Sequence, residues 1–338
     1  MGIGEALGFS TGWTAGAIIS GAYFGDKISP LSDTTVLASS TTNTPLFSHI
    51  RYMMYTTVPT MIITLIIFTV AGFVFDHSHD GQVMSFAASL KETFHISAAL
   101  MIVPIATGIL IAKRVASIIT LFISALLAAV FAILFQPDLL QQIAGAESIN
   151  AASMFKGAFM TLYGSTQLET GNEMLNSLVS TRGMAGMMNT IWLIICAMCF
   201  GGAMTASGML ETITSVFMRF MQRRASMVAS TVFSGLTLNI CTADQYISII
   251  LTGNMFKEIY RKKGYESRLL SRTTEDAVTV TSVLIPWNTC GMTQATILSV
   301  PTLTYLPYCF FNLISPLMSI IIAILGFKIK KHHEEDQD

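Results

Sequence analysis

The sequence predicts an all-α membrane protein that crosses the lipid bilayer several times. Of its 338 residues, 52% are hydrophobic and 12% are charged, whereas about 25% of the residues of an ordinary soluble domain are charged. The charged residues lie between the apolar runs rather than inside them. A soluble fold of this size could not bury so much apolar surface, so lipid is expected to cover much of it. The net charge of −1 argues against a nucleic-acid partner.

Long apolar runs identify the expected spans, because a helix of about 20 residues crosses the hydrocarbon core. The candidate spans are residues 52–75, 96–112, 115–135, 189–217 and 302–327. Polar, glycine or proline residues interrupt the other apolar stretches, which are residues 12–46, 225–256 and 277–300. The first helix also carries glycines four residues apart, at Gly4, Gly8, Gly12 and Gly16, which predicts a face for close helix packing.

Lys and Arg residues set the expected orientation, because they concentrate in cytoplasmic loops. Placing the basic clusters inside gives a consistent alternation, with residues 76–95 forming an external loop and 136–188 also outside. Residues 328–338 then form a charged cytoplasmic tail at the C-terminus. The expected location is a bacterial cytoplasmic membrane.

Residues 225–256 are expected to enter and leave the membrane on one side, because basic clusters flank both ends. Each half has about 14 residues, too short to cross at about 1.5 Å per helical residue. The polar run 239–244 breaks the middle. We therefore expect a re-entrant helical hairpin with its tip near mid-membrane. A single kinked span is the alternative.

Two interrupted segments resemble each other when they are aligned on Pro30 and Pro286, and each proline is expected to break its helix. The charge distribution gives the two segments opposite orientations, as in inverted-repeat transporters whose broken helices meet at a midplane site. The expected organisation is the remainder of a first repeat over 1–75 and a second repeat over 96–327. Much of the first repeat, including its own hairpin, is expected to be absent.

Four runs carry a resemblance to a known family: GAIISGAYFGDKISPLSDTTVLAS (16–39), STRGMAGMMNTIWLIICAMCFGG (180–202), NICTADQYISIILTGNMF (239–256) and LLSRTTEDAVTVTSVLIPWNTCGM (269–292). They resemble the NhaC-type Na+/H+ antiporters of the ion-transporter superfamily. The resemblance covers essentially the whole chain, and it implies a scaffold and a transport domain with paired re-entrant hairpins. It also implies a longer N-terminal part in a complete member. Because the family includes exchangers of organic acids and amino acids, it does not fix the substrate.

The two helix breaks are the expected sodium site, because sodium takes oxygen ligands and unwound helices offer carbonyl and hydroxyl oxygens. The oxygen-bearing candidates are Ser29, Ser32, Asp33 and Thr34 at the first break, and Asn288 and Thr289 at the second. Asp33, Ser32, Asn288 and Thr289 are the hypothetical Na+ ligands. No cofactor is expected.

Proton coupling requires a carboxyl group at which a proton and sodium compete, and ionisable groups at membrane depth are functional by default. The candidates are Asp26, Asp33 and Asp244. Asp33 comes first, although it could instead cap a half-helix beginning at Thr34. Lys27 could neutralise Asp26 or substitute for the departing ion.

Glu275 and Asp276 are interpreted more simply as acidic residues that favour the start of a helix. The predicted function is exchange of Na+ for H+ by alternating access. The alternative is a sodium- or proton-coupled exchanger of an organic acid or amino acid, such as malate/lactate. No hydrolase or metalloprotease motif indicates an enzyme. A channel would also use broken helices, but inverted repeats with opposed breaks favour alternating access over a permanent pore. The chain could also form a homo-oligomer.

Overall fold

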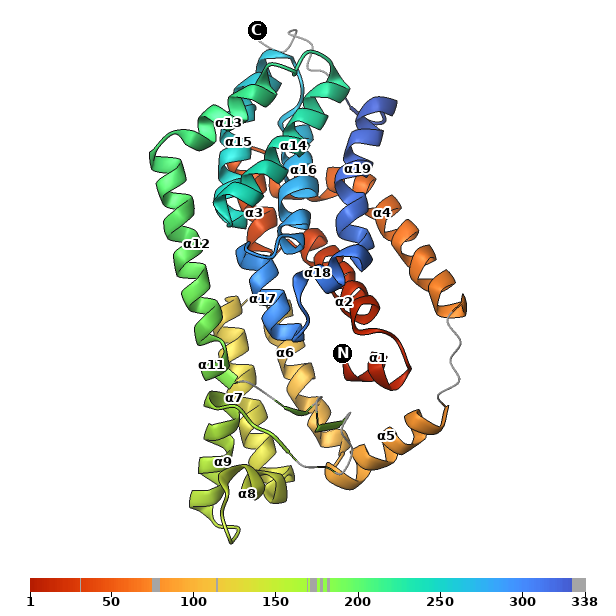
Figure 1. Ribbon diagram of the computed structural model, residues 1–338, viewed down its shortest axis with the longest axis vertical. Coiled ribbons are helices and arrows are strands. Elements are labelled where there is room, and N and C mark those ends of the chain that lie inside the picture. Colours follow the sequence, from red (N-terminus) through yellow and green to blue (C-terminus); the bar gives the residue numbers. More distant parts are fainter. Residues whose placement is uncertain are drawn as a thin grey trace. The chain divides into compact units, whose positions relative to one another are not determined.

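A computed structural model describes residues 1–30, 32–74, 80–113, 115–168, 170, 175–176, 179–180 and 183–329. Helices make up nearly all of these residues (Figure 1). The chain divides into two compact units. Unit 1 contains Met1–Ser10 and His77–Asn189, and unit 2 contains Thr11–Asp76 and Thr190–Asp338. Helices from both expected repeats therefore share unit 2.

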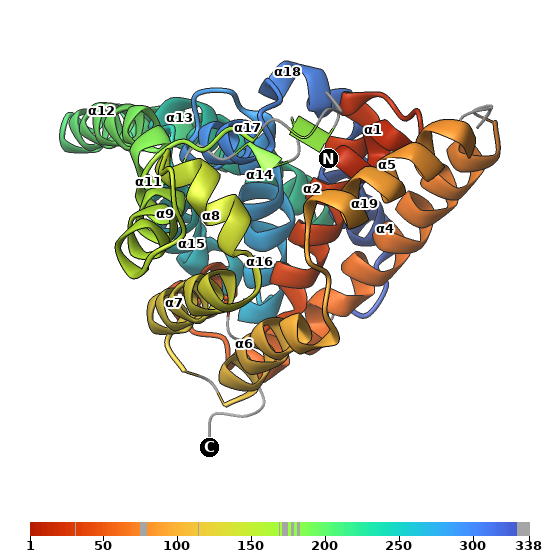
Figure 2. The same ribbon diagram turned by 90° about the horizontal axis from the view of Figure 1, so that it is seen from below.

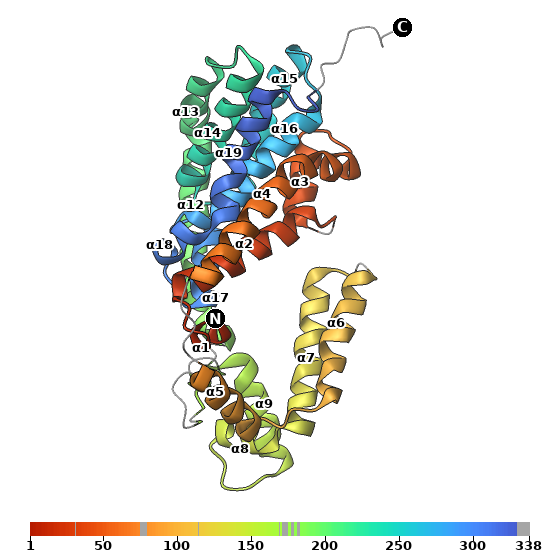
Figure 3. The same cartoon turned by 90° about the vertical axis from the view of Figure 1, so that its right-hand side faces the viewer.

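Unit 1 is a set of mostly short helices. In chain order they are α1 (Gly2–Ala6), α5 (Asp80–Thr93), η1 (Ala98–Met101), α6 (Ile102–Ala112), α7 (Ser117–Phe135), α8 (Pro137–Ala144), α9 (Ala151–Tyr163) and α11 (Gly183–Gly186). Figure 3 shows α6 and α7 side by side, and Thr107 Oγ1 lies 2.7 Å from Ser124 Oγ between them. The expected external loop 76–95 is not all loop, because it contains α5.

Unit 2 holds most of the longer helices and all three interrupted stretches. Its helices are α2 (Thr11–Ile28), α3 (Asp33–Thr41), α4 (Leu46–Val74), α12 (Met188–Ala206, from Thr190 on), α13 (Met209–Met218), α14 (Arg224–Thr242), α15 (Gln245–Lys262), α16 (Ser267–Thr274), the π-helix η2 (Glu275–Thr279), η3 (Ser282–Leu284), α17 (Thr289–Leu298), α18 (Thr302–Tyr305), η4 (Leu306–Tyr308) and α19 (Phe310–Leu325). The expected tail lies largely outside the described residues, which end at Ile329.

Several helices are long and apolar enough to cross a bilayer, which makes the chain a multi-pass membrane protein. Four helices pass by length and composition, and up to six spans result if each bent pair counts as one, all within the described residues. The expected span 302–327 is one such pair, bent by 55° between η4 and α19. The expected span 189–217 is wrong as one helix, because Gly208 adopts a left-handed conformation and separates α12 from α13.

Both proline-containing segments are broken where the sequence predicts. Helix α2 ends at Ile28 and α3 begins at Asp33, on either side of Pro30. The helical stretch that starts with α16 ends at Leu284, and α17 begins at Thr289 after Pro286. Short polar side chains cap the second half-helices, Ser32 at α3 and Asn288 at α17.

Helices α14 and α15 form a helical hairpin that turns at Ala243 and Asp244. Ala243 has a φ of 56°, and Asp244 caps α15 by accepting a hydrogen bond from the Ile247 amide. The two helices have 19 and 18 residues, longer than the 14 expected for each half. Both helices extend into the basic segments that flank the hairpin. As a result, α14 is long and apolar enough to cross a bilayer. A re-entrant hairpin stays a prediction.

Only part of the expected glycine face exists as one face. Gly4 lies in α1, and Gly8 follows α1 with a φ of 78°. Gly12 and Gly16 lie in α2, where both approach Tyr308. A Cβ atom at Gly16 would lie 2.5 Å from the Tyr308 carbonyl oxygen, so the close approach requires glycine.

Replacing Gly16 by alanine is expected to destabilise unit 2, because neither backbone can yield without moving a helix. Overpacking of this kind costs about 1–3 kcal/mol, and the melting temperature of the purified protein in detergent should fall. Gly21→Ala is the matched control in the same helix, since nothing lies within 4 Å of its added Cβ. Equal melting temperatures for the two variants would contradict this packing.

Candidate functional site

The first helix break collects oxygen atoms around the Thr34 side chain. Ser32 caps α3 and places its Oγ 3.0 Å from Thr34 Oγ1. Asp26 Oδ2, at the end of α2, lies 3.3 Å from the same hydroxyl. Glu275 Oε1, from the π-helix η2, also lies 3.3 Å away. We call Asp26, Ser32, Asp33, Thr34 and Glu275 the Thr34 cluster.

The Thr34 cluster has more oxygen acceptors than protons to share among them. Thr34 Oγ1 carries a single proton, yet it lies within hydrogen-bond distance of two carboxylates and one hydroxyl. Two carboxylate oxygens that share one donor repel each other unless a proton or a cation lies between them. Glu275 Oε2 is buried without a hydrogen-bond partner among the described residues. The cluster therefore fits an additional positive charge.

The cluster extends from the surface of unit 2 to its interior. Asp26 and Asp33 are exposed, Ser32 and Thr34 are buried, and Glu275 is fully buried. Asp33 is the first residue of α3, where its Oδ1 accepts a hydrogen bond of 2.9 Å from the Thr34 amide. Its Oδ2 accepts one of 2.6 Å from the hydroxyl of Tyr246, at the start of α15.

The buried carboxylates come from a π-helical turn in the middle of a long helical stretch. Residues 275–279 form this turn between α16 and η3, and all five are buried. The turn follows α16, which is labelled in Figure 2, and it packs against α3, α14, α15 and α19. Such turns are rare in proteins overall, but many of those that occur lie at functional sites. The extra residue alters the direction of neighbouring side chains. Here Glu275 contacts the Thr34 cluster, whereas Asp276 contacts a second group.

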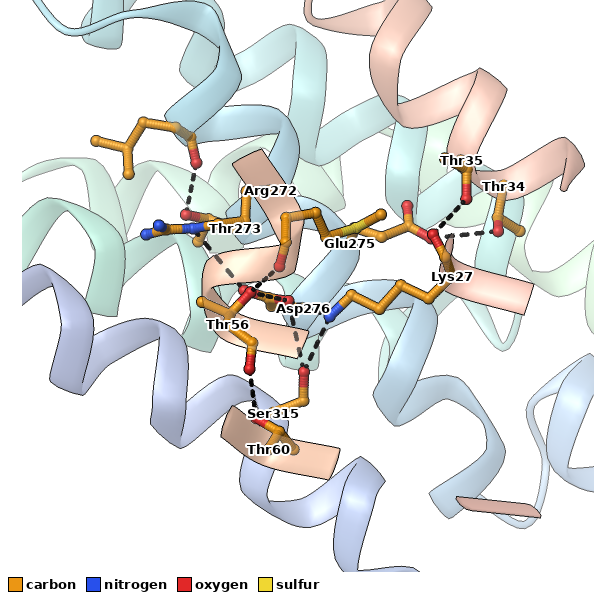
Figure 4. A network of polar contacts seen from close by, with 12 residues as sticks. Lys27, Thr34, Thr35, Thr56, Thr60, Arg272, Thr273, Glu275, Asp276 and Ser315 are labelled. Carbon is orange, nitrogen blue, oxygen red and sulfur yellow. Dashed lines mark hydrogen bonds and ion pairs between the residues drawn. The ribbon is translucent and has the colours of Figure 1, made fainter. Parts of the chain in front are cut away.

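The second group is a fully buried charge network around Asp276 (Figure 4). Lys27 Nζ forms an ion pair with Asp276 Oδ1 and also donates to Ser315 Oγ at 3.2 Å. Thr56 Oγ1 donates to Asp276 Oδ1 at 3.1 Å. Arg272, about one helical turn before Asp276 in the sequence, has its Nε 4.0 Å from Asp276 Oδ2. We call Lys27, Thr56, Arg272, Asp276 and Ser315 the charge network.

Arg272 is the least satisfied member of the charge network. Its side chain is fully buried, and none of its guanidinium nitrogens has a hydrogen-bond partner among the described residues. Its Cζ lies 4.8 Å from the centre of the Tyr52 ring, which provides a cation–π contact. A buried guanidinium with free donors can accept the carboxylate of another group that reaches it.

The hairpin tip and the second helix break form a third polar group, which we call the hairpin-tip cluster: Asn239, Asp244, Asn288 and Thr289. Asn288 Nδ2 donates to the Asn239 carbonyl at 3.2 Å. Thr289 Oγ1 donates to Asp244 Oδ2 at 3.3 Å. Asn239 Oδ1 is buried without a partner among the described residues.

The structure divides the predicted site residues between two clusters. Ser32, Thr34 and Asp26 lie in the Thr34 cluster, and Asp244, Asn288 and Thr289 lie in the hairpin-tip cluster. Among the described residues, no hydrogen bond joins Asp33 or Ser32 directly to Asn288 or Thr289. The Asp33–Tyr246 bond reaches only the start of α15. Ser29 contributes backbone hydrogen bonds at the break, with its amide donating to the Asp26 carbonyl.

Two local interpretations of the sequence are corrected. Ser32 caps α3, so Asp33 is not the cap and the half-helix begins one residue earlier than Thr34. Lys27 forms its ion pair with Asp276 and not with its neighbour Asp26, because successive helical residues point in different directions.

Sequence reasoning misjudged Glu275 and Asp276. They were expected at the start of a helix, but the helix begins at Ser267, so both lie inside it and are buried. The apolar stretch 277–300 suggested that a helix begins near residue 275, but the helical hydrogen bonds begin at Ser267 and continue through this position. The pair of acidic residues directly before an apolar run was the sequence signal for a buried site, because buried charges require partners and are functional by default in membrane helices.

Comparison with known proteins decides the family. The sequence profile described as the Na+/H+ antiporter family matches residues 21–327, a range that holds all three clusters. The chain belongs to this family. No solved structure matches the chain.

Individual antiporters resemble the chain over nearly all of its length. The Na(+)/H(+) antiporter NhaC of Alkalihalophilus pseudofirmus is 34% identical over 98% of this chain and 69% of its own length. The malate-2H(+)/Na(+)-lactate antiporter of Bacillus subtilis is 35% identical over 96% of this chain and 66% of its own length. The arginine/ornithine antiporter ArcD of Halobacterium salinarum is 32% identical over 99% and 67%. The antiporter is therefore similar to transporters with different named cargoes.

Proposed function

We propose that this antiporter exchanges Na+ for H+ by alternating access across the bacterial cytoplasmic membrane. The observation that carries the proposal is the Thr34 cluster, where Asp26 Oδ2 and Glu275 Oε1 share one hydroxyl proton. Carboxylate and hydroxyl oxygens are suitable ligands for a hard cation. Either a proton or a sodium ion would relieve the repulsion between the two carboxylates, so the two ions would compete for one place.

The helix break gives the cluster the local structure that ion exchange requires. Pro30 lies in the break between α2 and α3, and the Lys27 carbonyl near the end of α2 accepts a hydrogen bond of 3.4 Å from Thr35 Oγ1. Ser32 and Thr34 supply short hydroxyl arms at the same level. These features support a sodium site at the first break, with Glu275 in place of the expected Asn288 and Thr289.

Asp33 has a separate place in this proposal. Its carboxylate is exposed and is bonded to Tyr246, whereas Glu275 lies at the buried end of the cluster. Asp33 would thus collect sodium at the entrance and would not hold the exchanged proton. The Asp33→Asn variant should raise the apparent KM for sodium with little change in the maximal rate.

The test is dissipation of a pH gradient by sodium in inside-out vesicles or proteoliposomes that contain this chain. Addition of sodium should dissipate the gradient with saturating kinetics, and Asp33→Asn should shift only the half-saturating sodium concentration. Glu211→Gln, on the exposed surface of α13, is a charge-matched control. Inserted protein without any sodium response would overturn the proposed exchange.

A second candidate function is exchange of an organic acid, and one observation favours it. Arg272 offers buried guanidinium donors without partners, which fit a substrate carboxylate when the protein opens. Relatives named for malate, lactate, arginine and ornithine fall within the same range of identity. In the same vesicles, a proton flux that requires malate, lactate or an amino acid would replace the sodium–proton proposal with this one.

A further inference from the structure

A cavity in unit 2, separated from Arg272 of the charge network by the Tyr52 ring, is lined entirely by aromatic rings and hydrogen-bond donors. Its volume is about 530 Å³, and its lining residues are Phe47, Ser48, Arg51, Tyr52, Tyr55 and Arg268. Two guanidinium groups and three hydroxyl groups face one space that no lining carboxylate neutralises. Such a donor set recognises an anion with several oxygen atoms.

The two arginines differ in how they are held. Arg268 donates through Nε to Glu266, and its Cζ lies 4.9 Å from the centre of the Tyr52 ring, which fixes its plane. Its terminal nitrogens are not used in that ion pair. Arg51 is exposed and forms no ion pair within the described part of the chain. The cavity therefore combines a positioned guanidinium with a free one.

The position of the cavity along α4 places it at the level of lipid headgroups. Helix α4 has 29 residues, a length of about 43 Å, whereas the hydrocarbon core is about 30 Å thick. The polar residues lie in its first turns, and its second half is apolar. The cavity occupies these first turns. Aromatic side chains surround it, with Phe47 62% exposed and Phe327 52% exposed beside Tyr55, as is typical of a membrane interface.

We propose that this cavity binds the phosphate group of an anionic phospholipid, with Arg51 and Arg268 as its ligands. The headgroup phosphate would bridge the two guanidinium groups, and the acyl chains would lie along the exposed apolar side of α4. Basic pockets between membrane helices bind anionic headgroups in this way. Free inorganic phosphate has the same chemistry and is the other source of such an anion.

The test measures lipid retention by the full chain in nanodiscs and by native mass spectrometry. The probe is dioleoyl-phosphatidylglycerol, mixed into a phosphatidylcholine bilayer. The wild type should retain phosphatidylglycerol selectively. Arg51→Gln should lower its affinity at least about tenfold, because a charged hydrogen-bond pair is lost, and Arg51→Gln with Arg268→Gln should abolish selectivity. Arg51→Lys keeps the charge but lacks the planar pair of donors, so its affinity for phosphatidylglycerol should lie between those of the wild type and Arg51→Gln.

Arg261→Gln is the matched control, because Arg261 is an exposed arginine of α15 that pairs with Glu258 and lies outside the cavity. Equal losses in Arg51→Gln and Arg261→Gln, or no loss in Arg51→Gln, would overturn the site. Inorganic phosphate is then added to wild-type protein in pure phosphatidylcholine, where the melting temperature is measured, and to wild-type protein in the mixed bilayer, where retention of phosphatidylglycerol is measured. Failure of millimolar phosphate to raise the melting temperature or displace phosphatidylglycerol supports a lipid ligand. Displacement of phosphatidylglycerol or stabilisation by phosphate would overturn the lipid as the source.

Discussion

The Glu275→Gln variant is expected to lose sodium-driven proton flux completely while it stays folded. Glutamine keeps an oxygen that can accept the Thr34 hydrogen bond of 3.3 Å. It cannot take up and release a proton, and it offers sodium no charge. Because a neutral amide is less costly to bury than a carboxylate, the melting temperature should stay the same or rise. A loss of transport with retained stability is the combination that separates an exchanging residue from a structural one.

Flux is measured in proteoliposomes by a pH-sensitive dye after addition of sodium, at matched protein incorporation. Glu211→Gln, an exposed glutamate of α13, is expected to transport like the wild type. Glu275→Asp keeps the carboxyl group but shortens its reach, so flux should survive with a changed sodium affinity. Undiminished flux in Glu275→Gln would rule out Glu275 as the residue at which the two ions compete.

The Asp276→Asn variant is expected to lose stability most severely. Asp276 is the partner of Lys27, and Arg272 lies 4.0 Å from it, and all three side chains are fully buried. Removing one partner of a buried ion pair costs about 3–5 kcal/mol, because the remaining charge stays buried. Little monodisperse protein should survive detergent extraction. Flux should be absent in whatever remains.

The double variant Lys27→Met with Asp276→Asn tests the cause of this loss. It removes one of the stranded cations and should recover part of the stability that Asp276→Asn loses. Glu258→Gln breaks an exposed ion pair with Arg261, and it should cost less than about 1 kcal/mol. If the double variant is no more stable than Asp276→Asn, the unpaired lysine is not the cause.

The sequence predicts helix breaks well because proline acts locally. The breaks at Pro30 and Pro286 lie where expected, since the ring removes a backbone donor whatever the surroundings. Long apolar spans such as α4 are predictable for a similarly direct reason, because lipid must cover them. The family resemblance is confirmed by the match over residues 21–327.

Pairing between distant residues is not contained in local sequence. Lys27 and Asp276 are 249 positions apart, and no spacing rule joins them. The burial of Glu275 depends on a helix that begins earlier than the apolar run suggests and on a π-helical turn that is set by packing against α14 and α15. The choice of Ser32 over Asp33 as the cap is a difference of one residue, because both are short side chains that can accept a hydrogen bond from an amide of the first turn.

The π-helical turn links the Thr34 cluster to the charge network. Glu275 and Asp276 are consecutive residues, yet one contacts Thr34 and the other contacts Lys27. A rotation of this turn that withdraws Glu275 from Thr34 would also move Asp276 relative to Lys27, because the two residues share one backbone segment. Lys27 would then leave its ion pair in the same movement that opens the Thr34 cluster, so a single backbone turn would couple the two events.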